Sequence, residues 1–249
     1  MDERKKLDII YRIDDATDMI IKIFAVFLLL IGVYFTYDSA YVFYNSMATK
    51  VNIVRPGSDK EAEAVARDLT EDYVAWIQVD DTSLDYPIMQ GEDNAEYLNK
   101  DAYGDYSLSG AIFLDASNSP DFSDDYSLVY GHHMDGGFMF GCLDSWKNEN
   151  YFLKHLEGSL YVGDKTYDLK IFAYADADAM DMEVFSPSEH YPLNYIRNHA
   201  VNYVEPDGEK IVVLSTCASA TSTRRHIVAA VISERAANIL SVSGEQEDR

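Results

Sequence analysis

The stretch VVLSTCASATSTRRHIVAAVI, residues 212–232, contains two apolar runs, one cysteine and a pair of arginines. Its β-branched runs predict two strands, the first ending at Cys217 and the second beginning at His226. If these strands are neighbours, Arg224 or Arg225 can reach the thiol. A thiol is a useful nucleophile only where a nearby cation or histidine stabilises its thiolate. The stretch therefore predicts either a reactive cysteine at a strand end or a buried structural cysteine beside two surface arginines.

The same strand pattern recurs along the chain. Runs of strand-forming residues, separated by Asp, Asn, Gly and Ser turns, occupy residues 73–79, 84–90, 110–115, 126–132, 159–164, 166–176, 210–217 and 226–232. Eight short strands at this spacing predict a mostly β protein, either a barrel or a sandwich. Three other segments, 58–72, 139–156 and 188–204, are predicted to be helical, the last with Ser188 as its N-cap.

The N-terminal region contains one long apolar segment. Residues 19–37 are apolar apart from Lys22 and Thr36, and the apolar character resumes at 40–44. This is long enough for a membrane-spanning helix, so residues 19–44 are predicted to be a transmembrane signal anchor. A cleaved signal peptide and a buried core helix are the alternatives; the first lacks a good cleavage site.

The basic residues around this segment predict its orientation. ERKK at 3–6 and Arg12 precede it, so the positive-inside rule places residues 1–18 in the cytoplasm as a short tail. The rest of the chain would then be extracellular, in a protein that crosses the cell membrane once. An oxidising exterior would permit a Cys142–Cys217 disulfide, which is the structural alternative for both cysteines.

The composition narrows the classes of partner. A formal net charge of −23 disfavours nucleic acid and anionic lipid headgroups. The sequence shows no internal repeat, no nucleotide-binding motif and no clustered metal-ligand spacing, so neither a cofactor nor a metal site is expected.

One of the six histidines stands at a predicted strand end. In LVYGHHMDGGFMFG, residues 128–141, the strand stops at Gly131 and His132 opens a glycine-rich loop. Strand ends are where a barrel presents catalytic side chains. Solvated or core positions are the default for the other histidines.

The segments LVYGHHMDGGFMFG and VVLSTC followed by arginine resemble the sortases, and specifically class B. The resemblance extends to residues 76–98 and 109–118 and to the helical insertion before the cysteine strand. It covers about residues 70–235 and implies an eight-stranded β-barrel catalytic domain with peripheral helices. Residues 45–69 would then be a linker with an N-terminal helix, and 236–249 a polar tail.

The resemblance also implies an activity. Such an enzyme is a transpeptidase that cuts an LPxTG- or NPxTN-like sorting signal on secreted proteins. It holds the acyl group as a thioester and passes it to an amine of the cell wall or of a pilin. The competing functions are an extracellular cysteine peptidase that uses water, and a non-catalytic surface protein that binds peptides.

Site residues follow from the resemblance by position. His132 would be the catalytic acid, Cys217 the nucleophile and Arg225, rather than Arg224, the essential arginine. Adjacent strand residues face opposite sides, which supports choosing only one arginine. An acidic residue expected soon after the cysteine is absent, so no supporting carboxylate is assigned. The residues expected to line the peptide groove are Asn94, Leu98, Tyr130 and Ser215.

Overall fold

The computed structural model describes residues 3–52, 55, 69–217 and 223–236. The chain divides into two compact units, residues 1–47 and 48–249.

The first unit is formed by a single long helix, α1 (Glu3–Asn52). Within it, Tyr11–Val42 spans 32 residues, and the most apolar 18-residue window of this stretch has a mean hydropathy of 2.4 and is not buried by protein. At 1.5 Å per residue this stretch is about 48 Å long, which exceeds the hydrocarbon thickness of a bilayer. The predicted apolar segment, residues 19–44, therefore lies inside a helix that is long and apolar enough to cross a membrane.

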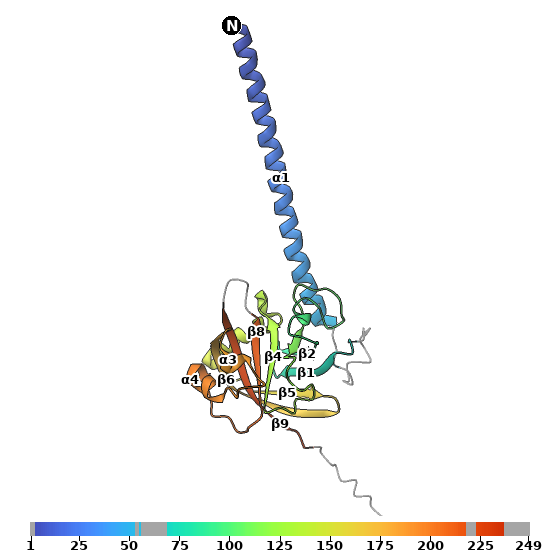
Figure 1. Ribbon diagram of the computed structural model, residues 1–249, viewed down its shortest axis with the longest axis vertical. Helices are drawn as coiled ribbons and strands as arrows, with labels where there is room; N and C mark the ends of the chain where they lie inside the picture. The colour runs from blue at the N-terminus through green and yellow to red at the C-terminus, as the bar shows by residue number, and fades with distance from the viewer. Residues whose placement is uncertain (1–2, 53–54, 56–68, 218–222, 237–249) are drawn as a thin grey trace, which may run out of the picture. The chain divides into compact units, whose positions relative to one another are not determined.

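The described residues of the second unit form nine strands, most of which are labelled in Figure 1. They are β1 (Tyr73–Val79), β2 (Asp85–Met89), β3 (Ile112–Leu114), β4 (Tyr126–His132), β5 (Glu157–Val162), β6 (Lys165–Asp178), β7 (Ala200–Tyr203), β8 (Ile211–Cys217) and β9 (Arg224–Glu234). The order β5-β1-β2-β3-β4-β8-β9-β6 is closed by the pairing of β5 with the first half of β6, and β7 pairs with a later part of β6, on the edge opposite β9. Closure removes free edges from eight strands. The predicted eight-stranded barrel is confirmed, and each of the eight predicted strands is present.

The helical predictions are only partly correct. The short helices of this unit are η2 (Glu96–Leu98), η3 (Asp135–Gly137), η4 (Phe140–Lys147), α2 (Glu149–Phe152), α3 (Met182–Phe185) and α4 (Leu193–His199). The segment 139–156 forms the 3-10 helix η4 and then α2, which Asn148 caps by accepting a hydrogen bond from the Tyr151 amide at 3.1 Å. Of the segment 58–72, residues 56–68 lie outside the described residues, and 69–72 are not helical.

The expectation for residues 188–204 is wrong at both ends. Helix α4 begins only at Leu193, with Pro192 rather than Ser188 at its N-cap. Proline suits a helix start because its ring fixes φ and it has no amide hydrogen to leave unpaired. At the other end the chain leaves the helix and becomes β7, because the edge of β6 offers backbone partners, such as Ala173 for Tyr203.

Strand alternation divides the core into two layers. In β9, Val228 and Ala230 face the barrel interior together with Trp146 of η4. Ile227 and Ala229 belong instead to an outer layer, which the short helices α3 and α4 cover.

Neighbouring strands β4 and β8 follow the same rule. Val129 and Leu214 face the interior, whereas Leu128 and Val213 face the outer layer. Side chains of a strand alternate between its two faces. The assignment of these core residues therefore also tells whether each residue at the strand ends faces the barrel interior or the outer layer.

Candidate active site

Strands β4 and β8 lie side by side (Figure 1). Their parallel pairing brings His132 and Cys217 to the same end of the two strands. Their register runs from Tyr126 opposite Ile211 to His132 opposite Cys217, the last pair in both strands. Parallel strands end at the same edge, and paired positions on neighbours are about 5 Å apart. Residues 85 positions apart in sequence thus become neighbours through backbone register alone.

The two positions also belong to the same alternating series. His132 follows Leu128 and Tyr130 in the outer series of β4, and position 217 follows Val213 and Ser215 in the outer series of β8. The register therefore places both on the face of the sheet opposite the barrel interior.

A main-chain carbonyl orients the His132 ring. The half-buried imidazole has its Nε2 atom 2.7 Å from the carbonyl oxygen of Leu98, at the end of η2. A carbonyl only accepts, so Nε2 carries the hydrogen and donates it. Leu98, a predicted groove residue, thus contacts the predicted catalytic histidine through its backbone.

Arg225, on β9, lies on the side of the Cys217 position that is opposite His132. Its Nη1 atom donates to the carbonyl of Thr216, the residue before Cys217, at 3.2 Å. The β8–β9 ladder pairs Ser215 with Ile227, and two further steps in that register put Arg225 opposite Cys217. His132, Cys217 and Arg225 thus stand in a row across three adjacent strands, and we call these positions the catalytic row.

The neighbouring arginine belongs to the other face. Arg224 is exposed and pairs in register with Asp178 of β6. Strand alternation puts it in the interior series of β9, away from the catalytic row. The geometry therefore distinguishes two arginines that adjoin in the sequence.

Gly131 allows the strand end to pack closely before His132. A Cβ atom at this position would lie 2.4 Å from the Ile112 Cδ1 atom and 2.8 Å from the Phe140 ring. Both neighbours belong to the barrel core, so a larger residue would displace the strand that carries His132.

Two of the predicted groove residues meet at one carboxylate. The Tyr130 hydroxyl donates to Asp115 Oδ2 at 3.0 Å, and the Asn94 amide donates to the same oxygen at 2.8 Å. Asn94 also accepts a hydrogen bond from the Ala116 amide at 2.8 Å. These contacts connect the loop after β2 with β3 and β4, and they place Tyr130 two residues before His132.

Ser215 lies two residues before Cys217 in β8 and is not part of the catalytic row. It is the register partner of Tyr130 in the β4–β8 ladder. Its side chain is fully buried, and its hydroxyl donates to the Thr216 carbonyl at 3.3 Å. Of the predicted groove residues, Leu98 thus contacts His132 directly, whereas Asn94 and Tyr130 meet at Asp115.

The alternative disulfide is not formed. Cys142 lies buried in η4 and is not disulfide-bonded. Its thiol donates to the Met139 carbonyl at 3.1 Å within the barrel core. The chain contains only two cysteines, so the Cys142–Cys217 disulfide is excluded.

The sequence did not reveal a carboxylate near the site, but the structure has one. Asp144 of η4 accepts hydrogen bonds from His133 and His226, which directly follow His132 and Arg225 in sequence. Burial raises the pKa of Asp144, but the hydrogen bonds from the two histidines lower that pKa by more, so it is below its ordinary value. The only sequence signal was that two of the three catalytic candidates, His132 and Arg225, are each followed by a histidine.

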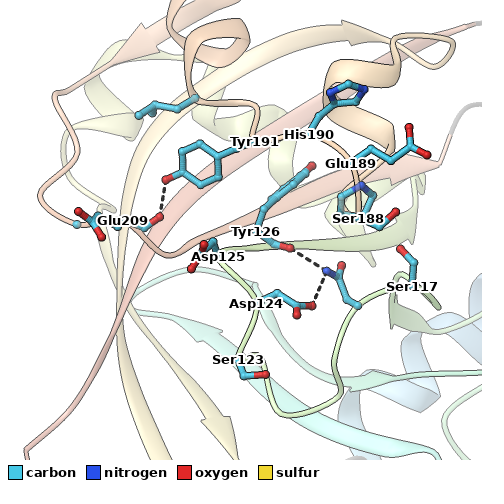
Figure 2. A pocket seen from close by; sticks show the side chains of 14 residues that line it. Ser117, Ser123, Asp124, Asp125, Tyr126, Ser188, Glu189, His190, Tyr191 and Glu209 are labelled. Atoms are coloured by element: carbon cyan, nitrogen blue, oxygen red, sulfur yellow. Dashed lines mark hydrogen bonds between the residues drawn. The ribbon is translucent and has the colours of Figure 1, made fainter.

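A large cavity lies at the opposite end of the same strands (Figure 2). It has a volume of about 930 Å³ and acidic walls that include Asp124 and Glu189. Figure 2 shows Tyr191 directed at Glu209, whose carbonyl accepts its hydroxyl hydrogen. Since it adjoins the first residue of β4, and His132 is the last, the cavity is about 20 Å from the catalytic row and is a separate feature.

Comparison with known proteins identifies the family. The sortase domain model matches residues 77–233, which include every strand except β1's first residues and the last residue of β9. The chain belongs to the sortase family. Its relatives are of class B: sortase B of Listeria monocytogenes is 30% identical over 189 residues, covering 72% of this chain and 76% of that protein.

Solved structures of class B sortases have the same fold. A Streptococcus pyogenes class B sortase involved in pilus biogenesis is 40% identical, with a TM-score of 0.61 over 66% of this chain and 94% of that one. Sortase B from the type II pilus of Streptococcus pneumoniae is 32% identical, with a TM-score of 0.56 over 66% and 94%. This protein is therefore a class B sortase, a cysteine transpeptidase by family.

Proposed function

We propose that this class B sortase cleaves an LPxTG- or NPxTN-like sorting signal through a thioester on Cys217 and transfers the acyl group to an amine of the cell wall or of a pilin. The observation that carries the proposal is the register pairing of His132 with Cys217 at the ends of β4 and β8. A nucleophile and a proton donor on adjacent strand ends can act on the same peptide bond.

The reaction has two halves. The Cys217 thiolate attacks the scissile carbonyl, the peptide C–N bond breaks, and His132 gives its proton to the departing amine. The acceptor amine then attacks the thioester, the C–S bond breaks, and His132 takes up the proton that the amine loses. Arg225, whose guanidinium already donates to the Thr216 carbonyl, would donate to the substrate backbone or to the oxyanion of the tetrahedral intermediate.

Two of the relatives bear on the choice of acceptor. The solved sortases of S. pyogenes and S. pneumoniae that resemble this chain come from pilus systems, which supports a pilin amine over a cell-wall amine.

Helix α1 would anchor the enzyme in the cell membrane as a single span. The stretch Tyr11–Val42 is apolar enough to cross, and the basic residues before it favour a cytoplasmic N-terminus. The catalytic unit would then be extracellular, where secreted substrates emerge.

Product analysis tests this function. Full-length protein in detergent is given peptides with LPxTG- or NPxTN-like signals and either a lysine-bearing pilin peptide or an oligoglycine, and the products are measured by mass spectrometry. We expect amide exchange with the amine and a thioester adduct on the peptide that contains Cys217. Release of free carboxylate alone, at every amine concentration and with both signals, would identify a peptidase. Normal turnover by Cys217→Ala would leave only a peptide-binding role.

A further inference from the structure

Three side chains from distant parts of the sequence converge beside the catalytic row. His133 directly follows β4, Asp144 lies in η4 and His226 is the third residue of β9; we call them the His–Asp–His cluster. The His133 Nε2 atom is 2.8 Å from one Asp144 carboxylate oxygen, and the His226 Nδ1 atom is 2.5 Å from the other. All three offer a ligand atom, and these atoms lie within 4.8 Å of one another.

The donor set selects a class of ion. Two imidazole nitrogens and a carboxylate oxygen suit zinc and similar divalent transition metals, whereas calcium and magnesium prefer oxygen ligands. Around a tetrahedral zinc ion with bonds of about 2.0–2.1 Å, ligand atoms are separated by about 3.4 Å. In the cluster the two histidine–carboxylate separations are 2.8 and 2.5 Å, and the ligand atoms all lie within 4.8 Å of one another. Side-chain rotations would therefore bring all three donors to one ion and leave a fourth position for water.

A second carboxylate stands behind one of the histidines. The Oδ1 atom of Asp176, on β6, is 3.7 Å from the His226 Nε2 atom, the nitrogen that faces away from Asp144. Within the described part of the chain this oxygen is buried and makes no hydrogen bond. Metal-bound histidines commonly give their second N–H to such a carboxylate, which orients the ring. The backbone register supports the pairing, because Asp176 and His226 are partners in the β6–β9 ladder.

The cluster is accessible from solvent and lies behind the catalytic row. The side chains of His133, Asp144 and His226 are 35%, 45% and 27% exposed. His226 belongs to the interior series of β9 with Val228, one residue from Arg225 in the outer series. The cluster therefore connects the end of β4, helix η4 and the start of β9 from the face opposite to the reacting groups.

We propose that His133, Asp144 and His226 form a binding site for a divalent transition-metal ion of the zinc class. The bound ion would crosslink β4, η4 and β9 and so stabilise the two strand ends that carry His132 and Arg225. Binding is independent of the proposed transpeptidation, because none of the three ligands takes part in it.

Metal binding is tested on the full-length protein in detergent, with Co²⁺ as the spectroscopic probe and Zn²⁺ as the competitor. Cys217→Ala serves as the background, since a thiolate is itself a ligand for these metals. We expect one equivalent of Co²⁺ to give a visible d–d band that Zn²⁺ abolishes, and Zn²⁺ to raise the unfolding temperature. Asp144→Asn and His226→Asn should each weaken binding at least about tenfold, whereas His132→Asn and the exposed His190→Asn should not.

The second carboxylate gives an independent measurement. Asp176→Asn removes no ligand, yet it should weaken Co²⁺ binding about 10- to 100-fold, the usual effect of losing a carboxylate behind a ligating histidine. Circular dichroism identifies any variant that fails to fold. Absence of saturable binding by the Cys217→Ala protein, or equal binding by the Asp144→Asn and His226→Asn proteins, would overturn the proposal and leave the cluster as a hydrogen-bonded bridge.

Discussion

His132 and Cys217 are the last register partners of the parallel β4–β8 ladder, and both strands end with them. A parallel pairing aligns strand ends only if the register is correct, since a slip of one residue would also move one position to the other face. The site thus depends on packing along the whole ladder, beginning with Tyr126 and Ile211 at its far end.

Removing either partner of this pair should abolish transpeptidation. Cys217→Ala eliminates the thioester, and His132→Ala removes the acid that protonates the leaving amine, so we expect kcat to fall at least about 10³-fold in each. Steady-state assays with mass-spectrometric detection measure the loss. His190→Ala, an exposed histidine near the other end of β4, is the matched control and should remain active; equal losses in all three would contradict the assignment.

The two adjacent arginines should behave differently. Arg225→Ala should lower kcat/KM about 10²-fold, the scale of losing one transition-state donor, and Arg225→Lys should restore only part of it because an ammonium lacks the planar fork. Arg224→Ala, on the other face of β9, should cost less than about threefold. The opposite ranking would show that the catalytic face of β9 is the interior series.

Gly131→Ala should destabilise the barrel. Its methyl group would meet Ile112 and Phe140 at 2.4–2.8 Å, and overpacking of this kind costs about 1–3 kcal/mol. Unfolding by urea can be followed by tryptophan fluorescence, because Trp76 and Trp146 are both buried in this unit. Gly163→Asn is the comparison, because a Cβ atom at Gly163 would meet no other atom and its φ of 54° is one that asparagine tolerates. This substitution should change the free energy of unfolding by less than about 1 kcal/mol.

The loop before β4 should make stability depend on pH through Asp124. Burial raises the pKa of this carboxyl. Hydrogen bonds from Ser119 and Asn118 and the charge of Lys210 together lower the pKa by more than burial raises it, so the pKa is below its ordinary value. A depressed carboxyl pKa stabilises the fold above the unfolded value of about 3.9, and the contribution is lost as pH falls through the folded value. Asp124→Asn should therefore be less stable than the wild type at pH 7 and 5, by on the order of 1 kcal/mol.

Below pH 4 that difference should shrink, because the wild-type carboxyl also becomes neutral. Urea unfolding at pH 7, 5 and 3.5 measures the trend. A gap that stayed constant over this range would show that Asp124 acts through shape rather than charge.

Membrane topology is open to a protease experiment on intact cells. With the N-terminus inside, added protease should digest the barrel unit and leave a protected fragment of α1. Protection of the whole chain would contradict the orientation, and release of the full catalytic unit into the medium without protease would indicate cleavage of the helix as a signal peptide.

Much of the fold was predictable because it depends on local patterns. Alternation and β-branched runs located all eight barrel strands, and uniform apolarity located the long helix. The candidate catalytic residues were found because His132 and Cys217 stand at strand ends in recognisable motifs. These signals lie within short windows of sequence, where side-chain period and propensity act directly.

Other features depended on partners far away along the chain. Residues 200–203 became β7 rather than helix because β6 presents an unpaired edge, which no local window encodes. The family resemblance favoured Arg225 over Arg224, but only the β8–β9 register shows that Arg225, and not Arg224, lies opposite Cys217.

The sequence by itself determined the strands, the apolar helix and the chemistry of the reactive groups. Tertiary structure alone decided which of these groups meet. Asp144 approaches His133 and His226 across separations of 11 and 82 residues, because the apolar side chains of η4 pack into the barrel core. Burial of apolar surface drives this packing whatever the sequence distance between the partners. The contacts of Asp144 with the two histidines therefore follow from the three-dimensional packing and from no single segment of sequence.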